Sequence, residues 1–521
     1  MSNEYDIIII GSGVGGGTIA LELAKTGKKI LIIERGDKLP IEKENWNPRE
    51  VFIKKRYRAQ ETWIDKKGRE FRPNTNYWLG GNSTFYGAAL MRMKRQDFNE
   101  VKHYGGEISP EWPLDYDDFA PFYKKAEKLW NVHGQRGIDP NDEINDPPYP
   151  YPAVPHDEKL KDFLDHLKTK GMTPSPLPLG INYNIPDNNS KCILCPTCAG
   201  HPCHILAKSD ARTLCIDSIS KYSNVTIAKN LKAHKLISDG TGKNVKSVVC
   251  LSFDGQETFS ADIFILAAGA VNSAVILLNS ANSNHENGLA NSSDLVGRNY
   301  MFHTTSAMTS IMAHEAKAIF PKTYAIMDYY FKDKDGDFDF PMGQIQSLPA
   351  ANGAYVEGQI SHIIPHWVIP NFLSDWLGKH MISFMIMSED LPKLYNRVTL
   401  TNYGKIQLDY TPNNLVGHRR LINKLKNALQ GYSLGSRTMY EPHFEIDQMI
   451  PLLGTAHQCG TIKFGKNPKD SVLDINCKAH DLDNLYVTDS SFFPSSSAVN
   501  PALTIIANSY RVAEHIKERI K

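Results

Sequence analysis

The clearest indication of the fold is the segment YDIIIIGSGVGGGTIALELAKTGKKILIIERG, from Tyr5 to Gly36. Its apolar run at residues 5–10 predicts a buried strand, and the residues after the glycines predict a helix that ends near Gly27. A second apolar run then ends at Glu34. This order of strand, glycine-rich turn, helix and strand is typical of a nucleotide-binding βαβ unit.

The glycines at the first turn follow the pattern Gly11-x-Gly13-x-x-Gly16. In such a turn the first glycine permits the tight bend, the second lets the backbone approach a pyrophosphate, and the third allows close helix packing. Glu34 ends the second predicted strand, where a carboxylate can accept hydrogen bonds from the adenosine ribose. The pattern predicts dinucleotide binding but does not separate NAD from FAD.

Length and charge exclude several classes of function. At about 150 residues per domain, the 521 residues suggest three or four domain equivalents or two large interleaved domains. The 58 basic residues nearly cancel the 57 acidic ones, so binding of nucleic acid is disfavoured. The amino terminus lacks the basic region of a secretory signal, and the most apolar run, residues 263–271, is far too short to span a membrane. We therefore expect a cytoplasmic protein without an integral membrane segment.

Several later segments resemble the glucose-methanol-choline family of FAD-dependent oxidoreductases. They occur in the family's order along almost the whole chain. The matching segments are NYWLGGNSTFYGAAL at 76–90, EWPLDYDDFAPFYKKAEKLWNVHG at 111–134, FILAAGAVNSAVILLNSA at 264–281, DLVGRNYMFH at 294–303, NRVTL at 396–400, and NLYVTDSSFFPSSSAVNPALTIIANSYRVAEHI at 484–516.

The resemblance implies an α/β fold in which a discontinuous Rossmann-like FAD-binding domain is interleaved with an α+β substrate domain. The FAD-binding domain would comprise residues 1–300 and 454–521, and the substrate domain residues 301–453. The substrate domain would be an antiparallel sheet backed by helices, and the strand-like runs at 398–403 and 405–410 fit such a sheet.

The resemblance also implies that FAD is the cofactor and that residues 76–90 lie against the flavin. In pyranose oxidases a histidine after Ser-Thr in this loop carries a covalent flavin, whereas here Phe85 follows Ser83-Thr84. Because phenylalanine has no nucleophilic atom, FAD is predicted to be noncovalent. The residues expected to bind it are Gly11, Gly13, Gly16, Glu34, Gly80, Gly81, Asn82, Ser83, Asp489, Asn500 and Pro501.

Two residues match the catalytic pair of the family. His457 lies in GTAHQCGT and Asn500 in SSAVNPALT, so the pair resembles the His/Asn pair of pyranose oxidases. The family oxidises an alcohol by hydride transfer to flavin N5 while a base takes the hydroxyl proton. Since a neutral imidazole can accept a proton and an amide cannot, His457 is the expected base and Asn500 the expected hydrogen-bond donor to the substrate oxygen.

The expected function is oxidation of a primary or secondary alcohol to a carbonyl, with a sugar or polyol favoured and with oxygen or another electron acceptor as the second partner. The aromatic stretch between His362 and Met387 is also compatible with a hydrophobic or steroid-like alcohol as the substrate. That stretch is read as a core strand and helix, with a lid, an access channel or a dimer surface as alternatives. A flavoenzyme of another reaction type, such as a lyase or photoenzyme, and a nonenzymatic FAD-binding module also remain open.

Four of the eight cysteines fall close together, as Cys192-x2-Cys195-x2-Cys198-x4-Cys203 in the loop at 190–210. Four cysteines this close together suggest a binding site for zinc or for an iron–sulfur cluster. An iron–sulfur cluster would make the protein an electron-relaying sugar dehydrogenase. The spacing differs from known iron–sulfur motifs, and some family members have a similar turn without metal. We favour a turn that binds no metal, with free thiols or a disulfide.

Overall fold

The nucleotide-binding part of the molecule is built on a sheet with parallel strands at its centre. The computed structural model describes residues 4–186, 191–315, 318–349, 376, 379–439 and 456–521. The strand order is β11-β2-β1-β14-β13-β12, and β22 pairs with β14. The strands span Glu4–Ile10 (β1), Ile30–Ile33 (β2), Val225–Ala228 (β11), Lys232–Ser238 (β12), Val245–Ser252 (β13), Gly255–Leu266 (β14) and Leu485–Val487 (β22).

Apolar runs without polar alternation place β1 and β2 at the centre of this sheet. Residues Ile7–Ile10 and Ile30–Ile33 are almost fully buried, and the two strands pair in parallel. Strands of a parallel sheet are usually buried on both faces, and the continuous Ile and Leu side chains of these two strands are suited to that burial. Helix α1 (Val14–Ala24) packs on β1 and β2, and α5 (Ala270–Asn279) packs on β12. Helices α10 (Ala502–Arg519) and α2 (Tyr116–Leu129) follow outside α1.

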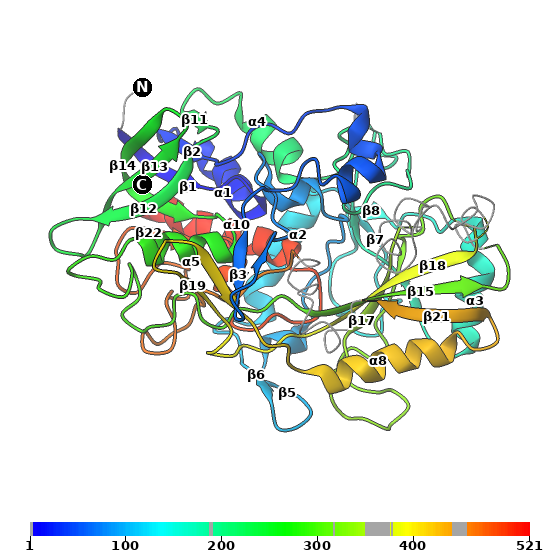
Figure 1. The fold of residues 1–521 in the computed structure, drawn as a ribbon. Coiled ribbons are helices and arrows are strands. Elements are labelled where there is room, and N and C mark those ends of the chain that lie inside the picture. The colour runs from blue at the N-terminus through cyan, green and yellow to red at the C-terminus, as the bar shows by residue number, and fades with distance from the viewer. Residues whose placement is uncertain (1–3, 187–190, 316–317, 350–375, 377–378, 440–455) are drawn as a thin grey trace.

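The C-terminal segment completes the nucleotide-binding part. Strand β22 adds to β14 in parallel, and helix α10 packs between α1 and α2. In Figure 1 the red C-terminal helix accordingly lies beside the blue N-terminal one. The two halves of this part are therefore close in space although most of the chain separates them.

A separate antiparallel sheet forms the other side of the molecule (Figure 1). Its strand order is β21-β15-β18-β17-β16-β9. Helices α3 (Lys161–Thr169) and α8 (Leu415–Ala428) share a buried apolar cluster with it. The strands span Pro174–Pro176 (β9), Thr304–Met312 (β15), Tyr324–Ile326 (β16), Gln344–Ser347 (β17), Met381–Ser388 (β18) and Ser433–Met439 (β21).

The strand-like runs at 398–403 and 405–410 do form a hairpin, β19 (Arg397–Leu400) with β20 (Ile406–Asp409). The hairpin does not belong to the antiparallel sheet backed by helices. It joins β3 (Trp63–Asp65) and β4 (Glu70–Phe71) in a smaller sheet, because Val398 and Leu408 pack on Trp63 and on α5. Shorter strands elsewhere are β5 (Val101–Lys102), β6 (Ile108–Ser109), β7 (Val132–Gly134), β8 (Tyr151–Pro152) and β10 (Leu179–Gly180).

The architecture confirms the predicted fold class, a Rossmann-like sheet interleaved with an antiparallel sheet backed by helices. The division at residues 300/301 and 453/454 stays a prediction, although β9 joins the antiparallel sheet from a position well before residue 301.

Within the described ranges, no helix is both long and apolar enough to span a membrane. Of the aromatic stretch, residues 362–375 and 377–378 lie outside the described part, and its last residues form β18.

Candidate active site

The glycine-rich turn lies where β1, β14 and β22 end together. Gly11 has φ +104°, and a side chain there would collide with the carbonyl of Ala267 at the end of β14. A Cβ on Gly16 would collide with the carbonyl of Gly11. The turn is therefore packed so tightly that only glycine fits at these two positions.

The N-terminus of α1 offers an anion site. Gly13 precedes the helix, no side chain in the described part caps it, and nothing lies within 4 Å of the position a Cβ would take. Gly81 approaches from the loop at 76–90, since its Cβ would lie 3.2 Å from the Gly13 Cα. The first N–H groups of α1 can therefore meet a pyrophosphate between these two turns.

Glu34 connects the second strand to both turns. Its Oε2 accepts hydrogen bonds from the backbone N and Oγ of Ser12, at 3.2 and 2.6 Å, and Oε1 accepts from the N of Gly36 at 2.9 Å. Ser12 Oγ in turn accepts from the N of Gly80 at 3.1 Å. Burial raises the pKa of Glu34, and these donors oppose that effect. The carboxylate thus stands at the strand end where a ribose would lie.

The loop at 76–90 is folded by its own polar side chains. Ser83 Oγ donates to the Gly80 carbonyl at 2.6 Å and accepts from the N of Ala211 at 3.0 Å. Asn82 Oδ1 accepts from the N of Asn76 at 2.8 Å. These contacts leave the left-handed backbone at Gly80 and Gly81, with φ of +93° and +56°, facing the glycine-rich turn.

Asp489 joins the ends of β14 and β22. Its Oδ2 accepts from the N of Gly269 and the Oγ of Ser273, at 3.0 and 2.5 Å. Its Oδ1 accepts from the N and Oγ of Ser491, at 2.9 and 2.5 Å. Burial raises the pKa of Asp489, and the four donors counter it. The uncapped helix, the open face of Gly13 and these carboxylates at adjoining strand ends fit a dinucleotide such as FAD, while each residue's contact with it stays a prediction.

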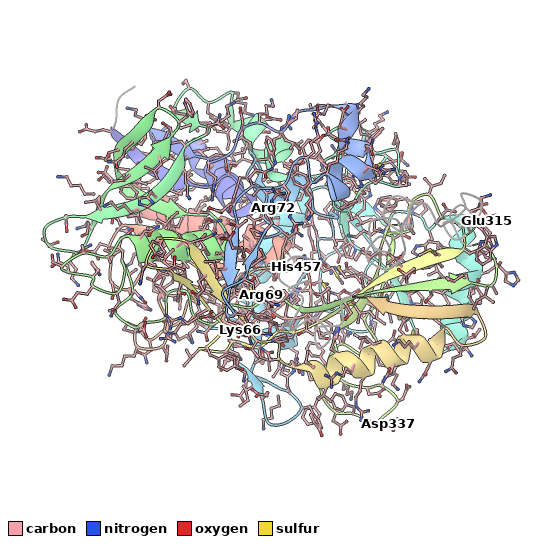
Figure 2. All side chains as sticks on the ribbon, in the orientation of Figure 1. Lys66, Arg69, Arg72, Glu315, Asp337 and His457 are labelled. Carbon is pink, nitrogen blue, oxygen red and sulfur yellow. The ribbon has the colours of Figure 1, made fainter. Side chains whose placement is uncertain are left out.

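His457 lies near the middle of the molecule in Figure 2 and pairs with a second histidine. The Nδ1 atoms of His457 and His303 are 3.0 Å apart, and Nε2 of His303 lies 3.1 Å from the carbonyl oxygen of Ser496. Burial lowers the pKa of His303 to about 4. Burial, then His303, then the ammonium of Lys322 hold the pKa of His457 well below its usual range. Both rings are therefore neutral at pH 7.

The contacts of this pair determine its tautomers. The carbonyl of Ser496 can only accept, so the proton of neutral His303 is on Nε2 and its Nδ1 carries a lone pair. The short Nδ1 to Nδ1 contact then requires that the proton of His457 be on Nδ1. Nε2 of His457 consequently has a free lone pair, which is the form that a general base needs.

Asn500 is oriented by two glutamines of β17. Gln346 Nε2 donates to Asn500 Oδ1 at 2.5 Å and to Gln344 Oε1 at 2.9 Å. Gln344 Nε2 donates to the carbonyl of Ala498 at 2.5 Å. The amide oxygen of Asn500 is therefore occupied, and its NH₂ group has no hydrogen-bond partner among the described residues. It is left to donate to a ligand.

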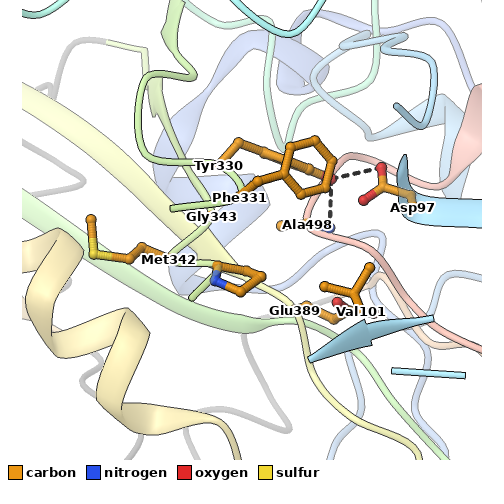
Figure 3. Close-up of a pocket in the computed structure, with 9 residues that line it drawn as sticks. Asp97, Val101, Tyr330, Phe331, Met342, Gly343, Glu389 and Ala498 are labelled. Atoms are coloured by element: carbon orange, nitrogen blue, oxygen red, sulfur yellow. Dashed lines mark hydrogen bonds between the residues drawn. The ribbon is translucent and has the colours of Figure 1, made fainter. Parts of the chain in front are cut away.

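The segment at 496–500 adjoins a pocket that Ala498, Tyr330 and Asp97 help to line (Figure 3). The hydroxyl of Tyr330 accepts from the N of Ala498 and donates to Asp97 Oδ2, both at 3.0 Å. Burial raises the pKa of Asp97 to about 8. Together with His303 and Gln344, Tyr330 holds the backbone that presents Asn500.

Comparisons with known proteins agree with this geometry. The models of the GMC oxidoreductase family match residues 5–305 and 405–509. The chain belongs to the GMC oxidoreductase family. It is therefore an oxidoreductase acting on alcohol groups, and GMC oxidoreductases are FAD flavoproteins.

Its relatives differ in what they are named for. Paromamine 6'-oxidase of Streptomyces fradiae is 27% identical over 98% of this chain and 91% of its own length. The 2-methyl-1,2-propanediol dehydrogenase of Mycolicibacterium austroafricanum is 25% identical over 99% of this chain and 96% of its own. Among solved structures, pyridoxine 4-oxidase from Mesorbium loti has a TM-score of 0.69 at 18% identity and covers 99% of both chains.

The cysteine-rich loop of this GMC oxidoreductase is organised by a lysine. Cys192, Cys195, Cys198 and Cys203 are free thiols, and nowhere in the described part are three His, Cys, Asp or Glu side chains arranged to hold a metal ion. Lys208 Nζ donates to the carbonyls of Thr84, Cys198 and His201, at 3.4, 2.9 and 2.7 Å. The loop therefore packs under residues 76–90 through backbone groups.

Three residues of this site are not predicted by the sequence. His303 ends a segment that resembles the family, but nothing local marks its contact with His457. Gln346 and Lys322 lie outside every matched segment. Their positions become apparent only when the antiparallel sheet is placed against the C-terminal segment.

Proposed function

We propose that this GMC oxidoreductase oxidises an alcohol group of a sugar or polyol to the carbonyl, with His457 as the base. The proposal rests on the two contacts that run from the carbonyl of Ser496 through His303 to His457, because the tautomers that satisfy both contacts leave a lone pair on Nε2 of His457. FAD, when bound, supplies the acceptor for the hydride of the alcohol carbon.

The residues of the chain divide the remaining work. His457 takes the hydroxyl proton, and its low pKa keeps the ring neutral before the reaction. The NH₂ group of Asn500 donates to the substrate oxygen and stabilises the negative charge that develops there. Gln346 holds that amide in the donating orientation.

The cofactor would be held by backbone and carboxylates at the strand ends. Gly11, Gly13 and Gly16 admit the pyrophosphate to the N-terminus of α1, and Glu34 would accept from the ribose. The other expected contacts come from residues Gly80, Gly81, Asn82, Ser83, Asp489, Asn500 and Pro501.

We further propose that FAD is noncovalent. Phe85 packs against Leu39 and Tyr57 in a small apolar cluster and has no nucleophilic atom. Acid precipitation of the purified protein should leave the yellow colour in the supernatant. Colour that stays with the pellet would contradict the proposal.

A substrate of this kind fits the names of two relatives, an oxidase of paromamine and a dehydrogenase of a diol. We expect the reduced flavin to pass its electrons either to oxygen or to another electron acceptor. Reoxidation of the reduced flavin with each of them distinguishes the two.

The test is anaerobic reduction of the bound flavin by a panel of sugars, polyols and long-chain or steroid alcohols. Polyols or sugars should bleach the flavin absorbance and yield the carbonyl product by mass spectrometry, and reoxidation with oxygen or an artificial acceptor identifies the second partner. Bleaching by hydrophobic alcohols alone would overturn the substrate class, and bleaching by no alcohol would overturn the reaction.

A further inference from the structure

Lys322 is a buried lysine to which the proposed mechanism assigns no contact with the substrate. Lys322 precedes β16 and is only 4% exposed. Its Nζ is so close to Gly87 that a Cβ on that glycine would collide with it, and the same Cβ would lie 3.1 Å from Ala199. The ammonium therefore lies between the loop at 76–90 and the cysteine-rich loop.

Lys322 also acts electrostatically on His457, whose pKa it helps to lower. The ammonium reaches the loop at 76–90 from the side of the antiparallel sheet, because Lys322 precedes β16 and its Nζ lies against Gly87. β16 pairs with β17, which carries the Gln346 that orients Asn500.

This ammonium has no anionic partner among the described residues. The groups that act on it are the thiol of Cys198 and the ammonium of Lys208. Burial raises the pKa of the Cys198 thiol, so the sulfur is neutral at pH 7. Lys208 is itself a cation and is already used by three backbone carbonyls. Burying an unpaired charge is costly, so a buried ammonium of this kind is expected to meet a negative charge from a ligand.

We propose that Lys322 is an anion-binding residue of the active site, and that the alcohol this enzyme oxidises carries a carboxylate, as in a polyhydroxy acid. The inference rests on the proposed function and narrows its substrate class. A single ammonium balances a single negative charge, and Lys208 is not available to balance a second one, so a carboxylate fits better than a phosphate dianion.

The charge of Lys322 is present at neutral pH. Burial lowers the pKa of Lys322 to about 8, so the group is mostly protonated at pH 7 and loses its proton as the pH rises through 8. Binding of the anion should therefore weaken above pH 8.

The experiment compares two alcohols that differ in the carboxylate, glycerate and glycerol, on the FAD-loaded protein. Acetate is titrated in parallel while the absorbance spectrum of the oxidised flavin is followed, which reports binding without turnover. The wild type should prefer glycerate in kcat/KM and should show a saturable spectral change with acetate.

Lys322→Met should lower the glycerate-to-glycerol ratio of kcat/KM by at least about tenfold and abolish the acetate-induced change. Lys322→Arg should retain part of both. Gly87→Ala should mimic Lys322→Met, because its Cβ displaces the ammonium while the lysine is still present.

Two matched controls accompany these variants. Lys246→Met removes an exposed lysine of β13, and Gly240→Ala adds a Cβ at a glycine with nothing within 4 Å. Both should leave the ratio and the acetate titration unchanged.

An equal loss of activity on both alcohols in Lys322→Met, with no acetate-induced change in the wild type, would show that the ammonium serves the cofactor's own charge and would overturn the proposal. A wild type indifferent to the carboxylate would also overturn it. Failure of the proposed function is distinguishable, because the acetate titration still reports on Lys322 when no alcohol reduces the flavin.

Discussion

The two ends of the proposed site are constructed differently. The nucleotide end depends mainly on a local backbone turn, where Gly11 and Gly16 fit against carbonyls that leave no room for a side chain, with carboxylates at the adjoining strand ends. The catalytic end is made of side chains, where His457 and Asn500 each depend on a partner from another segment. A motif of neighbouring residues can therefore encode the nucleotide end. The catalytic end forms only when segments far apart in the sequence come together.

The largest effect is expected at the catalytic end. His457→Ala removes the lone pair that takes the proton, so reduction of the flavin by a good substrate should slow by about 10²–10⁴-fold. Stopped-flow absorbance measures the rate, and the flavin spectrum reports that FAD is still bound. His314→Ala, at an exposed histidine, is the control and should reduce at the wild-type rate. A His457→Ala variant that reduces normally would refute the assignment of the base.

At the nucleotide end, substitutions at two glycines should affect different properties, the stability of the fold in one case and the affinity for FAD in the other. Gly16→Ala pushes a Cβ into the carbonyl of Gly11 and should lower the free energy of unfolding by about 1–3 kcal/mol. The Cβ of Gly13→Ala meets no atom within 4 Å in the described part of the chain, so the apoprotein should keep its stability while its affinity for FAD falls. Thermal melts with and without FAD measure both. Equal destabilisation by the two variants would mean that Gly13 has a packing role.

His303→Ala tests whether the catalytic end depends on its second histidine. Without the acceptor at Nδ1 of His303, the tautomer of His457 is no longer determined, and flavin reduction should slow by about 10–100-fold. In the wild type the acid limb of kcat/KM should lie below pH 6.5, because burial lowers the pKa of His457. Since His303 also lowers that pKa, its removal should move the limb to higher pH. A slower variant with an unmoved limb would point to packing alone.

The smallest effect is expected at Gln346. Gln346→Leu removes the donor to Asn500 Oδ1, so the amide can rotate and the rate of reduction should fall about tenfold or less. Gln346→Glu is the sharper variant, since a carboxylate accepts hydrogen bonds and would turn the NH₂ of Asn500 away from the substrate. Steady-state kcat should therefore fall further in Gln346→Glu than in Gln346→Leu.

The nucleotide-binding unit can be predicted from the amino-acid sequence, because its parts are neighbours along the chain. Residues 5–36 contain both strands, the helix and the glycines. The positions of the glycines indicate where the turn leaves no room for a side chain. The sequence also singled out His457 and Asn500 through their resemblance to a family pair.

The contacts that support the catalytic end become visible in the folded molecule alone. His303 contacts His457 across 154 residues, and Gln346 contacts Asn500 across the same separation. Lys322, which precedes β16, meets Gly87 of the loop at 76–90 across 235 residues. A proton's position on a ring, an amide's orientation and an ammonium's missing partner depend on which groups lie within about 3 Å in space. Spacing along the chain does not specify those distances, whereas the packing of the two sheets around the C-terminal segment does.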